Sequence, residues 1–187
     1  MSSRTPRTAW LTLGLVATGL AVATILLTEW LHLQPCYLCI LQRLLMFVLG
    51  ALALLTALAI GTPVARWLGT SVVMIGSGGI AAAAYQTWLQ WQPPGSATCL
   101  SSDPGLIEQL VEWLGQLSPS LFLATGFCED DGLSIFDLSL ANWSLICFAL
   151  LSGVAVLALW RQRGPLASDT RRNPSDSHRT HLPGGLE

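Results

Sequence analysis

Four long runs of apolar residues dominate the chain, at about residues 9–28, 39–60, 67–86 and 141–160. A helix needs roughly 20 apolar residues to cross a bilayer core about 30 Å thick, and each run has about that length. The first run is too long for the apolar segment of a removable signal peptide, and it lacks a small-residue cleavage signal. The pattern therefore predicts an all-α membrane protein, a bundle of four transmembrane helices.

A shorter apolar pattern lies between the third and fourth runs. Its apolar residues recur at helical spacing, and polar residues lie off the apolar stripe; the stripe consists of Leu106, Ile107, Leu110, Val111, Leu114 and Leu117, and the polar residues are Glu108, Gln109 and Glu112. We expect a short amphipathic helix here, lying on the membrane surface. In the third run, the small residues Gly76-Ser77-Gly78-Gly79 predict a face on which another helix packs closely.

Composition and charge give the predicted spans an orientation. The 187 residues are 52% hydrophobic and only 11% charged, and the formal net charge of −2 offers no basis for nucleic-acid binding. All nine basic residues are arginines; apart from Arg43, they lie before the first run, between the second and third, or after the fourth. The segments 29–38 and 87–140 contain none. Because basic residues collect in the cytoplasm, we expect cytoplasmic termini and both of these segments outside.

The domain boundary follows from the change to a polar, Pro-, Ser- and Arg-rich sequence near residue 164. We expect one transmembrane domain over residues 1–164 and a disordered cytoplasmic tail over residues 165–187.

Tryptophans lie close to the predicted span ends, where an indole ring prefers the headgroup level of a bilayer. Those near an end are Trp10, Trp30, Trp67, Trp88, Trp91, Trp143 and Trp160.

Four of the five cysteines fall on the predicted outer side, where disulfides form and persist. Cys36 and Cys39 form a Cys-x-x-Cys motif at the start of the second span, and Cys99 and Cys128 lie in the long outer segment. A helix start stabilises a thiolate, which makes the first pair a candidate redox centre. A structural disulfide or half of a zinc site is the alternative for that pair, with His32 and the loop cysteines as further ligands. Cys147, inside the fourth span, is expected to be a buried apolar residue.

Arg43 and the second cysteine pair leave two questions open. Arg43 lies one helical turn deeper than Cys39, on the same face, where an arginine is costly and typical of a functional site. It could stabilise a thiolate or an anionic oxygen, or its side chain could extend back to the headgroups. Cys99 and Cys128 could close a loop of about 30 residues as a purely structural crosslink, which would contribute roughly 3–4 kcal/mol.

Three segments resemble one family of membrane proteins. Leu33-Gln34-Pro35-Cys36-Tyr37-Leu38-Cys39-Ile40-Leu41-Gln42-Arg43 resembles the first redox motif of disulfide bond formation protein B. Ala97-Thr98-Cys99 and Phe122-Leu123-Ala124-Thr125-Gly126-Phe127-Cys128 resemble the segments around its second cysteine pair. The order of the spans also matches, so the resemblance covers about residues 9–160.

The resemblance implies a quinone-dependent thiol oxidase of the bacterial inner membrane, with its redox loops in the periplasm. A reduced periplasmic thiol carrier, DsbA, would attack Cys99, and electrons would pass from the Cys99–Cys128 pair to the Cys36–Cys39 pair. Cys39 would face a ubiquinone or menaquinone, and Gln42, Arg43 and Gln86 would complete the cofactor site. No metal is expected.

This chain departs from the family pattern at two positions. Some members carry an acidic residue where this chain has Gln42, and some carry a histidine where it has Gln86. Gln86 could hydrogen-bond a quinone oxygen, but an amide does not readily shuttle a proton.

Two other interpretations of the sequence stay open. The chain could be a relative of the vitamin K epoxide reductases, although in that family the helix-borne Cys-x-x-Cys usually comes late in the chain. It could also be a non-enzymatic scaffold with two structural disulfides.

Overall fold

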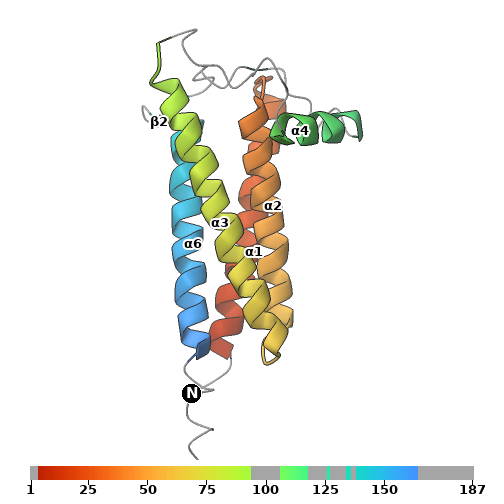
Figure 1. Ribbon diagram of the computed structural model, residues 1–187, viewed down its shortest axis with the longest axis vertical. Helices are drawn as coiled ribbons and strands as arrows, with labels where there is room; N and C mark the ends of the chain where they lie inside the picture. The colour runs from red at the N-terminus through yellow and green to blue at the C-terminus, as the bar shows by residue number, and fades with distance from the viewer. Residues whose placement is uncertain (1–3, 94–105, 118–125, 127–133, 136–137, 164–187) are drawn as a thin grey trace, which may run out of the picture.

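The computed structural model describes residues 4–93, 106–117, 126, 134–135 and 138–163. Four of its helices are long and apolar enough to cross a membrane: α1 (Arg4–Trp30), α2 (Tyr37–Leu58), α3 (Pro63–Gln90) and α6 (Leu140–Arg163). They run alternately up and down the bundle, with α1 beside α2, α2 beside α3, α3 beside α6, and α6 beside α1 (Figure 1). The predicted bundle is confirmed.

Backbone geometry explains where α2 begins and how it is joined to α3. Cys36 has an extended backbone and caps the start of α2. At the other end, α2 stops at Leu58, two residues before the predicted limit, and Gly61 follows with a positive φ of 95°. A positive φ suits glycine because it lacks a Cβ. Pro63 then opens α3, a position where its missing N–H has no helical partner to lose. The connection is therefore a tight turn.

Small residues bring the helices of the bundle close together. A Cβ on Gly50 of α2 would lie 3.2 Å from the carbonyl oxygen of Gly14 in α1, so these two backbones nearly touch. On α3, Gly76 and Gly79 are buried against α6, while Ser77 and Gly78 are exposed. The predicted packing face is thus one side of α3 only, as the helical period requires.

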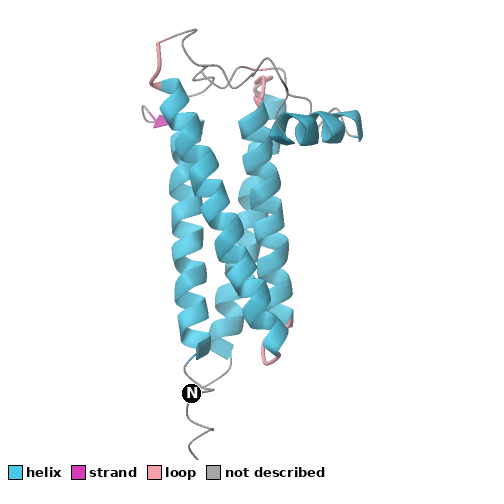
Figure 2. Ribbon diagram, viewed as in Figure 1, coloured by secondary structure: helices cyan, strands magenta, loops and turns pink. Residues whose placement is uncertain are grey.

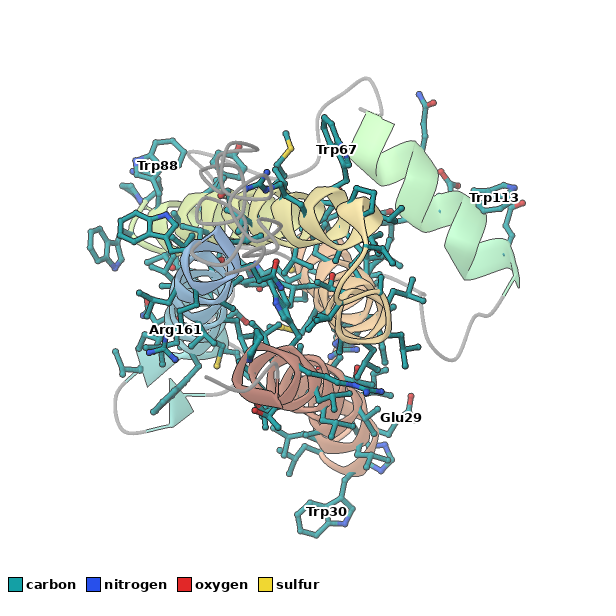
Figure 3. All side chains as sticks on the ribbon, turned by 90° about the horizontal axis from the view of Figure 1, so that it is seen from below. Glu29, Trp30, Trp67, Trp88, Trp113 and Arg161 are labelled. Atoms are coloured by element: carbon teal, nitrogen blue, oxygen red, sulfur yellow. The ribbon has the colours of Figure 1, made fainter. Side chains whose placement is uncertain are left out.

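Most tryptophan side chains point away from the bundle, as predicted for rings at the headgroup level. Trp30, Trp67 and Trp88 project outward in Figure 3, and Trp91 and Trp160 are also exposed. Trp10 is a correction: its side chain is fully buried in the core instead of facing the headgroups. Its ring lies beside Gly69 of α3, which leaves room for the indole between the helices.

Short elements lie at the end of the bundle where α2 begins. Helix α4 (Leu106–Leu117) is present as predicted and lies across the bundle axis beside α2 (Figures 1 and 2). Its Val111 is buried, whereas Gln109 and Glu112 are exposed, in agreement with an amphipathic helix. The strands β1 (Ser134–Ile135) and β2 (Leu138–Ser139) form an antiparallel pair that the sequence pattern did not indicate. Residues 165–187, the predicted tail, lie outside the described residues.

Candidate functional site

The Cys36–Cys39 pair lies at the start of α2, where the helix geometry fixes both sulfur atoms. Cys36 is almost completely buried, and its Sγ accepts a hydrogen bond from the backbone amide of Cys39 at 3.4 Å. The two Sγ atoms are 2.9 Å apart, with the Cys36 thiol donating to Cys39. That hydrogen bond, together with burial, raises the pKa of Cys36. The pair is therefore arranged for Cys36 to keep its proton and for the Cys39 sulfur to act as the acceptor.

Two glutamines join this pair to the neighbouring helix. Gln86 of α3 is buried, and its Nε2 lies 3.2 Å from Cys39 Sγ and 3.5 Å from Cys36 Sγ. Its Oε1 accepts a hydrogen bond of 2.8 Å from Nε2 of Gln42, which is also buried. Because Gln42 donates to the oxygen of Gln86, the amide nitrogen of Gln86 must face the sulfur atoms.

Arg43 is held by the first helix. Its Nη2 donates a hydrogen bond to Oγ1 of Thr28, and that hydroxyl in turn donates to the backbone oxygen of Thr24. Thr28 is buried near the C-terminal end of α1. The guanidinium group is therefore fixed by a hydroxyl inside the bundle.

A cavity of about 260 Å³ lies between the four long helices beside Cys39. Most of its wall is apolar and includes Leu20, Met46, Leu140 and Phe148. The polar side chains in the wall include Cys39, Gln42, Arg43 and Gln86. A largely apolar cavity with a few convergent polar groups is typical of a site for a small organic ligand. Cys147 was expected to be buried, but it is only partly buried and also lines this cavity.

The second cysteine pair, Cys99 and Cys128, lies outside the described residues. Gly126, two residues before Cys128 in the sequence, is described. Its backbone amide donates a hydrogen bond to the carbonyl oxygen of Pro35 at 3.2 Å. Within the described residues, no group of three or more His, Cys, Asp or Glu side chains could hold a metal ion.

The structure thus brings together Cys36, Cys39, Gln42, Arg43 and Gln86, and adds two residues that the sequence did not single out. Thr28 supports Arg43 from α1, and Gly126 contacts the segment before Cys36. A threonine at the end of an apolar helix and a glycine in a loop are common features, so neither carries a signal of its own. Only the contacts between elements distant in the sequence reveal them.

Comparison with known proteins gives consistent matches. A family model described as disulfide bond formation protein DsbB matches residues 6–158. Disulfide bond formation protein B of Dechloromonas aromatica (strain RCB) is 43% identical over 162 residues, which cover 86% of this chain and 96% of that protein. The protein of the same name from Verminephrobacter eiseniae (strain EF01-2) is 36% identical over 172 residues, covering 87% of this chain and 94% of that protein.

Proposed function

Because the chain belongs to the disulfide bond formation protein DsbB family, we propose that it reoxidises a DsbA-like periplasmic dithiol carrier and passes the electrons to a membrane quinone. Membership makes the chain a multi-pass membrane oxidoreductase that forms disulfide bonds. The carrier, the quinone and the inner-membrane location are the finer parts of the proposal. One observation supports the quinone most: Cys39 lies in the wall of an apolar cavity together with Arg43 and Gln86.

The first half of the proposed reaction oxidises the carrier. A carrier thiolate attacks Cys99 in the Cys99–Cys128 disulfide, which forms a mixed disulfide and releases the thiolate of Cys128. The second carrier thiolate then attacks the carrier sulfur of this bond, so the carrier leaves with a disulfide and Cys99 and Cys128 remain as thiols. Two electrons have passed to the loop pair, and the rates depend on the thiolate fraction of each attacking group.

The second half passes these electrons to the pair at the start of α2. The thiolate of Cys128 attacks Cys36 in a Cys36–Cys39 disulfide and releases the thiolate of Cys39. Cys99 then attacks Cys128, so the Cys99–Cys128 bond forms again and Cys36 is released as a thiol. The released Cys39 would meet one hydrogen-bond donor, the amide of Gln86 at 3.2 Å, and one positive charge, that of Arg43 four residues further along α2. Both favour the anionic sulfur.

The residues around the cavity fit a quinone ring. A bound quinone would supply an acceptor for two electrons and two protons, and Cys36 and Cys39 would close to a disulfide as they give these up. Apolar groups such as Leu20, Met46 and Phe148 suit the ring, and Arg43 is a permanent cation for an oxygen that gains negative charge. Among the described residues, the titratable groups that line this cavity are cysteines and Arg43. The thiols of Cys36 and Cys39 can supply the two protons that the quinone takes up.

The test uses the full-length protein purified in detergent, with a reduced DsbA-like protein and either ubiquinone or menaquinone. We expect quinone absorbance to fall as the carrier becomes oxidised, in a ratio of one quinone to one carrier. The Cys128→Ser variant should accumulate a mixed disulfide between the carrier and Cys99. A protein that leaves quinone and carrier unchanged would be a scaffold, and adducts formed only through Cys36 or Cys39 would refute the assigned electron path.

A further inference from the structure

We propose that Gly126 is a positioning residue that docks the outer loop onto the segment before Cys36, and so brings Cys128 to the buried cysteine pair. The amide of Gly126 donates a hydrogen bond to the carbonyl oxygen of Pro35, the residue directly before Cys36. Gly126 is itself two residues before Cys128. This backbone contact therefore joins the residue directly before Cys36 to a residue two positions before Cys128, although the two cysteines are distant in the sequence. The inference rests on the proposed electron path.

Position 126 requires glycine because there is no room for a Cβ atom, and not because of its backbone conformation. A Cβ atom on Gly126 would collide with the carbonyl oxygen of Gln34, and it would lie only 2.9 Å from the carbonyl carbon of the same residue. The φ angle of Gly126 is not in the left-handed region, so alanine could adopt the same backbone conformation. The obstacle is therefore the backbone of Gln34, which cannot move aside as a flexible side chain can.

The surface that Gly126 contacts is held firmly. Pro35 has its φ angle restricted by its ring, and it leads directly into Cys36, the cap of α2. Cys36 is also buried, so its neighbours cannot shift without disturbing the start of the helix. An alanine at position 126 should consequently push the loop away and leave α2 in place.

The docked contact limits how far Cys128 can move from Cys36. Two residues of extended chain span at most about 7 Å, so a fixed Gly126 keeps Cys128 tethered close to the start of α2. Holding two reacting groups together in this way raises their effective concentration. Only the exchange between Cys128 and Cys36 uses this proximity, because attack of the carrier on Cys99 and reduction of quinone by the Cys36–Cys39 pair involve other contacts.

The experiment compares Gly126→Ala with Gly153→Ala in the full-length protein. Gly153 of α6 is a matched control because a Cβ there would meet nothing within 4 Å. Three steps are measured separately by rapid acid quench and thiol alkylation. They are oxidation of a reduced DsbA-like protein, transfer from the Cys99–Cys128 pair to the Cys36–Cys39 pair, and quinone reduction driven by dithiothreitol, a small dithiol that can attack Cys39, the less buried cysteine of its pair, without the loop.

We expect Gly126→Ala to slow the transfer between the pairs by about tenfold or more, since displacement of reacting groups by about 1 Å can cost about 100-fold. The other two steps should stay within about twofold of wild type, and Gly153→Ala should resemble wild type in all three. As a readout independent of activity, hydrogen–deuterium exchange should show the residue 126 amide protected in wild type and exposed in Gly126→Ala.

Three outcomes would overturn the inference: normal transfer between the pairs in Gly126→Ala, an equal loss in all three steps, or a Gly126 amide that exchanges freely in the wild-type protein. Failure of the proposed function is distinguishable from these, because in that case the wild-type protein itself would show no transfer between the pairs or no quinone reduction.

Discussion

Both the oxygen and the nitrogen of the Gln86 amide form polar contacts, and these contacts determine how Gln86 interacts with the two sulfur atoms. Its oxygen accepts from Gln42 and its nitrogen faces Cys39 and Cys36. Gln42 therefore acts through Gln86, because it fixes which end of the amide meets the thiolate. Neither amide takes up a proton at ordinary pH, so the pair supplies a fixed dipole in a buried place where such a dipole is effective.

Changing Gln42 to glutamate should weaken the site by reversing this arrangement. When ionised beside Arg43, a carboxylate only accepts hydrogen bonds, so Gln86 should turn its nitrogen toward residue 42 and withdraw it from Cys39. We expect steady-state quinone reduction to fall about tenfold, in line with about 1–3 kcal/mol for a buried polar group left without its partner. Oxidation of a carrier by the Cys99–Cys128 pair, measured without quinone, serves as the control. An unchanged rate of quinone reduction would show that the orientation of Gln86 does not matter.

Thr28 offers a second test at the scale of one side chain. Valine has nearly the shape of threonine but no hydroxyl, so Thr28→Val should release the Arg43 guanidinium while the packing stays similar. Since a hydrogen bond to a charged group contributes about 1.5–3 kcal/mol, we expect the apparent KM for quinone to rise about tenfold.

Thr28→Ser retains the hydroxyl and is the matched control, so its KM should remain near that of wild type. Equal behaviour of the serine and valine variants would mean that Arg43 needs no support from α1. A lower unfolding temperature in Thr28→Val, with an unchanged KM, would assign the hydroxyl to stability alone.

At the scale of helices, α3 presents two different sides within four residues. A Cβ on Gly79 would come within 2.6 Å of the Cζ atom of Phe148 in α6, whereas a Cβ on Gly78 would meet nothing within 4 Å. Close packing of small residues is a main source of helix association in lipid. Phe148 also lines the cavity, so the fit between α3 and α6 influences the candidate site as well as the bundle.

The pair Gly79→Ala and Gly78→Ala separates packing from helix propensity. Both substitutions favour the helix in the same way, but only the alanine at position 79 must displace an aromatic ring. We expect Gly79→Ala to lower the free energy of unfolding in micelles by about 1–3 kcal/mol, as overpacking does. Gly78→Ala should be neutral or slightly stabilising. Similar stabilities for the two variants would contradict the assigned packing face.

Sequence predicts the helices well because a bilayer imposes a length and a composition that each span must satisfy by itself. It also places Cys36, Cys39, Gln42 and Arg43 together, since their spacing lies within three turns at one end of a helix. Trp10 was mispredicted because its headgroup preference is a property of the isolated ring, whereas the space beside Gly69 belongs to the folded bundle. Partners such as Thr28 are set by helix pairing, which one span does not encode.

At the scale of the whole molecule, the described arginines near the helix ends mark one end of the bundle. Arg7 at the start of α1, Arg66 at the start of α3 and Arg161 at the end of α6 share this end, while the cysteine pair and α4 lie at the other (Figures 1 and 3). We therefore propose cytoplasmic termini and periplasmic redox loops.

Reporter fusions test this orientation. A periplasm-active reporter joined at Ser96 should be active, and the same reporter joined at Ser168 should be silent, with a cytoplasm-active reporter giving the reverse pattern. Activity of one reporter at both positions would place Ser96 and Ser168 on the same side, and both the four-span topology and the separation of redox loops from the termini would then be wrong.

The tryptophan in the cavity wall should make ligand binding visible in the fluorescence of the protein. Of the eight tryptophans, Trp143 alone lines the cavity, while most of the others point outward from the bundle. A quinone held there would take an electron from the excited indole and quench its emission. We expect titration with quinone to remove a saturable part of the intrinsic fluorescence in wild type but not in Trp143→Phe. The protein would then carry its own reporter of site occupancy, one that reads binding without turnover.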